Sequence, residues 1–480
     1  MNQPLVIPEP AETAQESGAG SMTLQQAGWR ALLASLAFQC AFEFGALNFL
    51  VLPGAYLLVT LSRVSSSRVA FRLGFASGLL VFGPQLAWFW RIFGPVAICL
   101  WAVLAAFIGL FTATIRIWRV SYGVRWLWLA IPVSWTGLEY FRSELYYLRF
   151  SWLSAGYAFS ERSGRLPVGL LGVYGLGFVL CLIAGLADQA GKKARLWLGT
   201  GSVLIIILSS LPPGPNKSTS LLRVAGIQLE FPPDLRVTEY LDRVDAKFPS
   251  SDLLVLSEYT FDGPVPKRVR EWCRQHRKYL IAGGKADGEE GGFYNSAFVV
   301  GPTGEIEFEQ AKSAPIQFFK DGLPARQQNV WSSPWGKIGI CVCYDLSYRK
   351  VTDRLVQQGA QAIIVPFMDI SEWGTHQHEM HSRVGPLRAR EYRLPIFRLG
   401  SSGISQLIDA DGRVLESAPF PGQEEIVGGN IELGPAGRLP LDSRVAPLCS
   451  VATAAFLLCR LAMPFLRRLG TRRQTSSLLS

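Results

Sequence analysis

Charged residues are scarce in this chain of 480 residues. Only 18% of the residues are Asp, Glu, Lys or Arg, whereas 49% are hydrophobic, and the mean hydropathy is +0.22. This composition is unusual for a soluble protein and indicates a membrane protein. The net charge of +10 does not come from one basic run, because the basic residues are spread between apolar segments. The spread argues against a nucleic-acid partner and is typical of topology signals.

Features of secreted and zinc-stabilised proteins are also missing. No two cysteines have the CxxC spacing, so a structural zinc site built on cysteine is not expected. Most of the eight cysteines lie in apolar runs, where thiols act as small hydrophobic side chains, and no disulfide framework follows. Residues 1–22 are polar and have no basic start followed by an apolar core. We therefore expect a disordered N-terminal tail rather than a signal peptide.

Apolar segments dominate the first half of the chain. Most are roughly 17 to 25 residues long, the length that crosses about 30 Å of hydrocarbon. The sequence predicts seven transmembrane helices within residues 23–215 and an eighth over 445–466, which precedes a basic tail at 467–480. The first seven are expected near 29–42, 45–61, 73–90, 95–117, 126–140, 166–187 and 196–211. The predicted architecture is an α-helical membrane bundle of about eight transmembrane helices.

Basic residues follow the second, fourth, sixth and eighth of these spans. The positive-inside rule then places both termini in the cytoplasm and the region between the seventh and eighth spans on the outer side of the membrane. The link between the fifth and sixth spans departs from this pattern, and its arginines are expected near lipid head groups or in a site: Arg142, Arg149, Arg162 and Arg165. Several tryptophans near span ends are expected to be interfacial anchors: Trp29, Trp88, Trp90, Trp126 and Trp128.

The composition changes after the Pro- and Gly-rich break at 211–220. Residues 222–434 contain short apolar runs that alternate with polar helical stretches. This alternation predicts an α/β domain of about 210 residues, a size suited to one hydrophobic core.

Three residues in this domain could together form a nucleophilic site. Glu258 ends the run LLVLSE, Lys312 lies in EQAKSAP, and Cys343 lies in KIGICVCYDLSY. A carboxylate can take the proton of a thiol, and an ammonium group can stabilise an oxyanion. Each residue alone is more often a solvated loop residue or an inert core cysteine, so the prediction depends on the combination.

The sequence KIGICVCY raises the question of which cysteine reacts. On a strand, Cys341 and Cys343 would share one face, so alternation does not decide between them. Cys343 is closer to the end of the strand, which favours it as the reactive thiol. Cys341 is then expected to pack in the core beneath it.

The order of motifs resembles that of the nitrilase, or carbon-nitrogen hydrolase, superfamily. The matching stretches are VAGIQ, LLVLSE, YNSAFVVGPTGE, the lysine segment, CYD, VPFMDISEW, RAREYRLPIFR and GISQLIDADGRVL. The resemblance implies an αββα sandwich with a Glu258–Lys312–Cys343 triad. Where the superfamily has PFGE this chain has PIQFFKDG, which makes Asp321 a secondary site candidate, together with Tyr344 and Asp345 of the CYD motif.

The membrane half extends the resemblance. A nitrilase-like domain between a seventh and an eighth span, together with the stretch 150–186, is similar to the apolipoprotein N-acyltransferase family. That family implies acyl transfer from a phospholipid to the N-terminal amine of a diacylglyceryl-cysteine lipoprotein. The implied mechanism is ping-pong through a Cys343 thioester, with Glu258 as base and with Lys312 and a backbone amide at the oxyanion. It needs no cofactor and no metal, and the expected partners of the monomer are the phospholipid, the lipoprotein and membrane lipid.

Two other functions remain open. A membrane-tethered amidase would use the same triad and release ammonia, whereas a transporter would use the domain for binding, although the spans lack a repeat of broken helices. A metal cluster of His376, His378 and His381 is disfavoured, because the resemblance makes His381 structural. Acidic residues near membrane depth are expected to line a cavity or lie at the interface: Glu43, Glu139 and Glu144.

Overall fold

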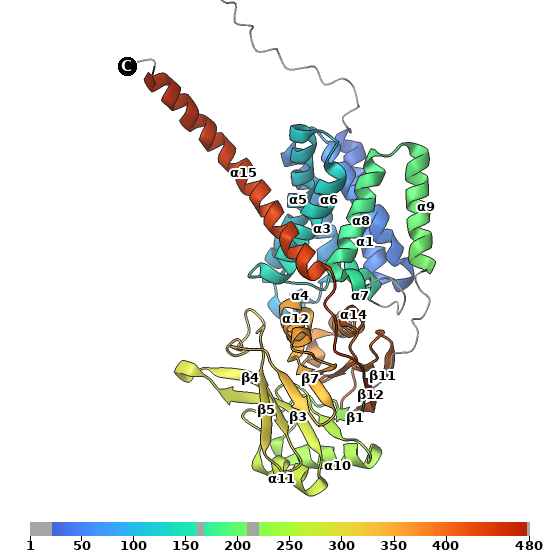
Figure 1. Ribbon diagram of the computed structural model, residues 1–480, viewed down its shortest axis with the longest axis vertical. Coiled ribbons are helices and arrows are strands. Elements are labelled where there is room, and N and C mark those ends of the chain that lie inside the picture. The colour runs from blue at the N-terminus through green and yellow to red at the C-terminus, as the bar shows by residue number, and fades with distance from the viewer. Residues whose placement is uncertain (1–21, 161–167, 209–219, 478–480) are drawn as a thin grey trace, which may run out of the picture.

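The computed structural model describes residues 22–160, 168–208 and 220–477, which form a helical bundle and an α/β domain joined end to end (Figure 1). Apart from Met22, the tail predicted for residues 1–22 lies outside the described residues. Arg162 and Arg165 also lie outside them.

A helix is present at each of the apolar segments predicted to span the membrane. The bundle consists of α1 (Leu24–Glu43), α2 (Val51–Thr60), α3 (Ser67–Gln85), α4 (Phe89–Phe93), α5 (Val96–Tyr122), α6 (Leu127–Tyr140), α7 (Val168–Leu171), α8 (Val173–Gln189), α9 (Lys192–Leu208) and the start of α15 (Asp442–Ser477). Within the described residues, three helical stretches are long and apolar enough to cross a membrane: Gly45–Arg63, Val96–Tyr122 and Asp442–Met463. The complete set of eight spans therefore stays a prediction.

Helices α3 and α5 approach each other closely. A Cβ atom added to Gly78 of α3 would lie 2.6 Å from the Cα atom of Ala105 of α5, so only glycine fits there. The hydroxyl of Thr112 donates a 2.8 Å hydrogen bond to the carbonyl of Ala70 across the same contact. Small residues and interhelical hydrogen bonds are the usual means by which helices pack in lipid.

An ion-pair cluster joins three bundle helices at one end. Arg63 after α2 and Arg119 of α5 each lie 2.6 Å from a carboxylate oxygen of buried Asp188 in α8. Both arginines belong to the basic residues that predict the cytoplasmic side. Their positive charges therefore also hold helices together, through ion pairs with Asp188.

The α/β domain contains two six-stranded sheets that pack face to face. The first has the order β12-β1-β2-β3-β4-β5 and the second the order β11-β10-β9-β8-β7-β6. Their strands are β1 (Ser220–Ile227), β2 (Leu253–Val255), β3 (Tyr279–Asp287), β4 (Phe293–Val300), β5 (Ile306–Ala311), β6 (Val330–Ser333), β7 (Gly336–Ile340), β8 (Ala362–Pro366), β9 (Ile396–Leu399), β10 (Ser405–Ile408), β11 (Val414–Ala418) and β12 (Ile426–Leu433).

Helices cover both outer faces of this sandwich. The helices α10 (Val237–Lys247) and α11 (Lys267–His276) pack on the first sheet, and α12 (Arg349–Gln357), α13 (Thr375–Ser382) and α14 (Val384–Tyr392) lie on the side of the second. Strand β2 is apolar on both faces, which explains why it needs cover on both sides. Leu253 and Val255 face the second sheet, whereas Leu254 faces the α10–α11 layer. The αββα arrangement predicted from the sequence is confirmed.

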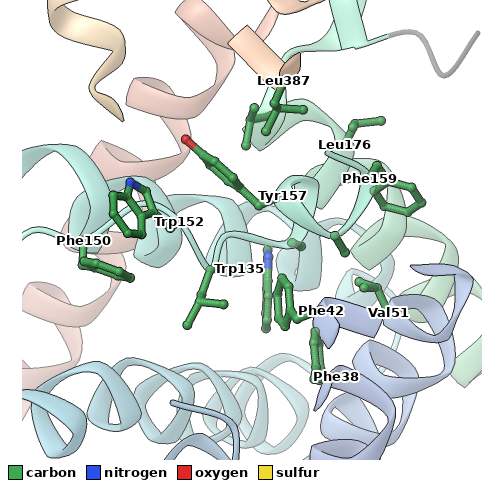
Figure 2. Packing of buried hydrophobic residues seen from close by; sticks show 14 of the residues in the cluster. Phe38, Phe42, Val51, Trp135, Phe150, Trp152, Tyr157, Phe159, Leu176 and Leu387 are labelled. Atoms are coloured by element: carbon green, nitrogen blue, oxygen red, sulfur yellow. The ribbon is translucent and has the colours of Figure 1, made fainter. Parts of the chain in front are cut away.

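One hydrophobic core runs from the bundle into the domain. The buried cluster that contains Phe38 and Trp135 of the bundle also contains Trp152 of the loop after α6 and Leu387 of α14. Figure 2 shows these side chains in one packed group, with Tyr157 between the bundle and Leu387. The α12–α14 layer is therefore packed on two sides, by the second sheet and by the bundle.

Candidate active site

The three predicted site residues each follow a strand. Glu258 comes after β2, Lys312 comes directly after β5, and Cys343 lies beyond the end of β7. Their exposed fractions are 3%, 1% and 2%. Charged groups are almost never buried to this extent unless they are paired.

A lysine between two carboxylates forms the polar side of the site. The Nζ atom of Lys312 lies 2.8 Å from Oε1 of Glu258 and 2.7 Å from Oδ2 of Asp321. The amide of Asn295 donates to both carboxylates, at 2.6 Å to Glu258 and 2.8 Å to Asp321, and the hydroxyl of Tyr259 donates to Asp321 at 2.9 Å. The cluster thus includes Asp321, the secondary acid predicted from the sequence.

Burial and charge set the protonation of this cluster. Burial raises the pKa of Glu258 and outweighs the opposing charge of Lys312, and the nearby charge of Asp321 raises it further. Burial acts to lower the pKa of Lys312, but Asp321, Cys343 and Glu258 outweigh it and hold that pKa well above the usual value. Lys312 therefore stays a cation, and Glu258 has an unusually high affinity for a proton.

Backbone atoms of Met368 connect the carboxylate to the thiol. The amide of Met368 donates a 2.8 Å hydrogen bond to Oε2 of Glu258, and its carbonyl lies 3.9 Å from Sγ of Cys343. Burial, followed by the charge of Glu258, raises the pKa of Cys343 well above its usual value. The resting cysteine is thus a thiol that needs a base.

The backbone at Cys343 is in the left-handed region, with a φ angle of +52°. A residue with a Cβ atom bears a cost of about 1 to 2 kcal/mol in that conformation. Strained residues of this kind are concentrated at functional sites, where the surrounding structure holds them in place.

The prediction that Cys341 and Cys343 share one face is wrong. Strand β7 ends at Ile340, and the chain turns at Cys343, so strand alternation does not extend over the two cysteines. Cys341 packs in the cluster shared with the bundle, whereas Cys343 packs in the cluster between the sheets. Both are buried, and Cys343 lines an apolar cavity.

Asp345 connects the cysteine turn to the lysine loop. Its carboxylate accepts hydrogen bonds from the backbone amides of Ser313 at 3.0 Å, Ala314 at 2.7 Å and Val342 at 3.2 Å. Burial raises its pKa to about 6. Asp345 is thus a positioning residue, whereas Tyr344, the other secondary candidate, lines the cavity beside Cys343.

An apolar cavity reaches Cys343 from the bundle. The α4–α5 region contributes Trp88, Phe93 and Leu104, and the domain contributes Phe318 and Trp373. Trp88 is buried in this wall, so the prediction that it is an interfacial anchor is wrong. Arg149, whose guanidinium lies 4.6 Å from the ring of Tyr348, adds a positive charge to the lining.

Family models match both halves of the chain. Residues 30–186 match the apolipoprotein N-acyltransferase N-terminal domain, and residues 218–440 match the carbon-nitrogen hydrolase family. Apolipoprotein N-acyltransferases from Geobacter metallireducens and Nitrosomonas europaea are each 25% identical. These alignments cover 76% and 81% of this chain and 82% and 89% of the relatives. The chain belongs to the apolipoprotein N-acyltransferase family.

A solved structure of the superfamily is also similar to this family member. Saccharomyces cerevisiae Nit3, of the nitrilase superfamily, is 18% identical, with a TM-score of 0.40. The match covers 46% of this chain and 93% of that one.

The three clustered histidines of this family member have separate partners. Nε2 of His376 lies 2.9 Å from the carbonyl of Gln85 in α3, and the ring of His378 lies between the carbonyl of Gly374 and the hydroxyl of Ser402. Nδ1 of His381 lies 2.6 Å from Oδ2 of Asp369. Within the described ranges, no group of three or more His, Cys, Asp or Glu side chains could hold a metal ion.

The acidic residues near membrane depth differ in their surroundings. Glu139 lines a second cavity, inside the bundle. Glu144 is buried at the junction with the domain, where it accepts hydrogen bonds from the hydroxyl of Tyr174 at 2.8 Å and the amide of Arg349 at 3.2 Å. Glu43 lies 3.5 Å from the amide nitrogen of Gln85.

Several site residues of this acyltransferase family member were not singled out from the sequence. Asn295 was noted only as part of the YNS motif, and its position between two carboxylates depends on the pairing of β4 with β3 and β5. Asp369 follows β8 in the VPFMD stretch, and a carboxylate after a buried strand was the same signal that identified Glu258. Tyr259 follows Glu258 directly, without a distinguishing signal.

Proposed function

We propose that this chain transfers an acyl chain from a membrane phospholipid to the N-terminal amine of a diacylglyceryl-cysteine lipoprotein, through a thioester on Cys343. Family membership already makes it an enzyme of the acyltransferase and carbon-nitrogen hydrolase superfamily, with lipid and lipoprotein substrates. The observation that carries the finer proposal is the place of Cys343, between a buried carboxylate–lysine cluster and an apolar cavity bordered by bundle helices.

In the first half-reaction, Glu258 accepts the proton of the Cys343 thiol, and sulfur attacks the ester carbonyl of the phospholipid. Lys312 stabilises the oxyanion that forms. The carbon–oxygen ester bond then breaks, Glu258 returns the proton to the leaving oxygen, and a lysophospholipid departs. The acyl chain remains on Cys343 as a thioester.

In the second half-reaction, the lipoprotein amine attacks the thioester carbon. A carbon–nitrogen bond forms and the carbon–sulfur bond breaks, while Glu258 moves a proton from the nitrogen to sulfur. The product is an amide, and the enzyme returns to its thiol form. The apolar lining suits an acyl chain, and Arg149 suits the phosphate of the donor.

We further propose that all eight helical segments span the membrane, with both termini cytoplasmic and the catalytic domain outside. The distribution of basic residues supports this orientation, because links on one side carry Arg68, Arg72 and Arg125, whereas the first link carries no Lys or Arg. Fusion of a cytoplasmic fluorescent reporter and, separately, alkaline phosphatase to the C-terminus tests it. Fluorescence without phosphatase activity is expected, and the reverse result would refute the orientation.

The thioester is tested by mass spectrometry of the purified protein with phospholipid. We expect a mass gain of one acyl chain on Cys343 in the wild type and in Cys341→Ala, and no such gain in Cys343→Ala. Absence of an adduct from the wild type, together with ammonia release from amides, would instead support a membrane-tethered amidase. Growth of a strain that lacks the N-acyltransferase, restored by the wild type but not by Lys312→Ala, would add evidence in the cell.

A further inference from the structure

His381 is a buried base candidate that the proposed mechanism does not use. It lies on α13 and lines the apolar cavity together with Cys343. Its ring stacks on Trp152, with the ring centroids 4.9 Å apart and the planes at 14°, and its Nδ1 atom is 2.6 Å from Oδ2 of Asp369. Among the described residues, the Nε2 atom of His381 has no hydrogen-bond partner.

The surroundings determine which ring nitrogen carries the proton. Burial acts to raise the pKa of Asp369, but the nearby His381 outweighs it and keeps that pKa low, so Asp369 is a carboxylate that accepts from Nδ1–H. Burial lowers the pKa of His381 and outweighs the opposing charge of Asp369. Beyond Asp369, the nearby Arg398 and His378 both oppose a positive charge on the ring. Arg149, Cys343 and Tyr344 are the further charged or titratable residues that line the cavity with it. His381 is therefore neutral at pH 7, with an unprotonated Nε2.

An unprotonated Nε2 without a partner can accept a hydrogen bond from a ligand. Buried polar atoms are rarely left without a partner, so the cavity is expected to receive a group with an N–H or O–H bond at this point. An ammonium group satisfies this requirement.

The second half-reaction needs such an acceptor. An ammonium nitrogen that becomes an amide nitrogen loses two protons, and only one of them returns to the sulfur of Cys343. Glu258 can carry the proton that goes to sulfur. Its oxygens already accept hydrogen bonds from Lys312, Asn295 and the amide of Met368, so Glu258 is poorly placed to take a second proton. Lys312 is itself a cation and Asp321 is paired with it. The other proton needs a second base.

We propose that His381, oriented by Asp369, binds the α-ammonium group of the incoming acceptor and takes its first proton through Nε2. The neutral amine then attacks the thioester, and its second proton passes through Glu258 to sulfur. The proton on His381 leaves to water after the product departs. The proposal rests on the Cys343 thioester. It assigns two bases to two proton transfers: Glu258 delivers a proton to sulfur, and His381 takes the first proton from the acceptor.

The test separates the two half-reactions. Wild type and variants are loaded with an acyl chain from phospholipid, and a lipopeptide with a diacylated N-terminal cysteine is then added. His381→Asn keeps a donor for Asp369 but removes the base, and we expect it to slow amide formation about a hundredfold more than it slows loading. His378→Asn is the matched control on the same helix, because both of its ring nitrogens already have partners, and it should affect the two steps equally.

The pH dependence distinguishes a base from a structural histidine. In His381→Asn, amide formation should rise with pH as the acceptor amine loses its proton in solution, and alkaline pH should restore most of the lost rate. Asp369→Asn supplies a second variant, since an amide that donates to Nδ1 would move the ring proton to Nε2 and should also depress amide formation selectively.

Equal slowing of both steps, or unchanged amide formation in both variants, would refute the role of His381. If even the wild type formed no adduct, the thioester itself would be refuted. The two failures are therefore distinguishable.

Discussion

The two sides of Cys343 differ in almost every physical property. One side holds Glu258, Lys312 and Asp321 in a buried cluster with fixed hydrogen bonds. The other side is a cavity with aromatic and aliphatic walls, which include Trp88, Phe93 and Leu104. Bond rearrangement needs preoriented charges in a dry site, whereas a lipid needs apolar surface. The left-handed turn at Cys343 places one sulfur atom where the two sides meet.

The largest effect is expected from a change on the charged side. Glu258→Gln keeps the shape of the side chain but removes the base, so the rate of Cys343 acylation should fall by about 10²- to 10⁴-fold. The rate is measured by mass spectrometry after mixing with phospholipid. Glu305→Gln, at an exposed glutamate, is the control and should acylate normally. Acylation of Glu258→Gln at the wild-type rate would show that the charged cluster is not the catalytic side.

A smaller effect is expected from Asp321→Asn, which leaves Lys312 with one carboxylate instead of two. Acylation should slow about tenfold, less than the loss of a direct oxyanion donor. Burial is the main reason that the pKa of Glu258 is raised, and the charge of Asp321 adds to it, so removal of that charge should lower this pKa. Because Glu258 acts as a carboxylate, the acidic fall in the acylation rate should move to lower pH. A shift to higher pH in the pH–rate profile would contradict this electrostatic account.

The apolar side should control the choice of donor rather than the chemistry. Val103→Trp places a large ring in the cavity wall on α5, and it should slow acylation by long-chain phospholipids about tenfold relative to short-chain ones. Val120→Trp, at an exposed position of the same helix, is the matched control and should not discriminate. Competition between two donors, read as the ratio of adduct masses, measures the effect. An unchanged ratio would mean that the chain does not occupy this cavity.

The smallest effect is expected from Cys341→Ala, because Cys341 belongs neither to the charged cluster nor to the apolar cavity wall described above. Loss of a buried sulfur should reduce the free energy of unfolding by about 1 kcal/mol. Thermal unfolding in detergent measures this change, and acylation of Cys343 in the same sample shows that function is retained. If the folded variant formed no acyl adduct, the assignment of Cys343 rather than Cys341 as the acylated residue would be contradicted.

Much of the site could be predicted because its main residues follow strands. Hydrophobic runs predict where buried strands end, and Glu258 and Cys343 each lie just beyond such a run. Lys312 instead follows β5, a mostly exposed strand, and its prediction depended on the family resemblance. The face of Cys341 was predicted wrongly, because alternation holds only while the strand continues, and a turn with positive φ is not encoded by hydrophobic spacing. Trp88 was misassigned for a related reason: its role depends on how α4 meets the domain loop, which is a tertiary contact.

The pairing of His381 with Asp369 could not be predicted from the sequence either. The two residues are close in the chain, but the resemblance implied only that His381 is structural, and it named no partner for the ring. The structure shows the ring buried against Trp152, with Nδ1 close to Asp369. These contacts leave Nε2 without a hydrogen-bond partner among the described residues.

The hydrophobic core shared by the bundle and the α12–α14 layer has a consequence for evolution and for engineering. A free-standing hydrolase can be tethered to a membrane by a linker and later released, but this catalytic half has an apolar outer surface on which the bundle packs. Residues 220–433 produced alone would leave Leu387 and its neighbours exposed to water and should aggregate or bind detergent. The membrane helices therefore keep water from an apolar face of the catalytic domain, so the domain could not be moved to another membrane anchor without a new cover for that face.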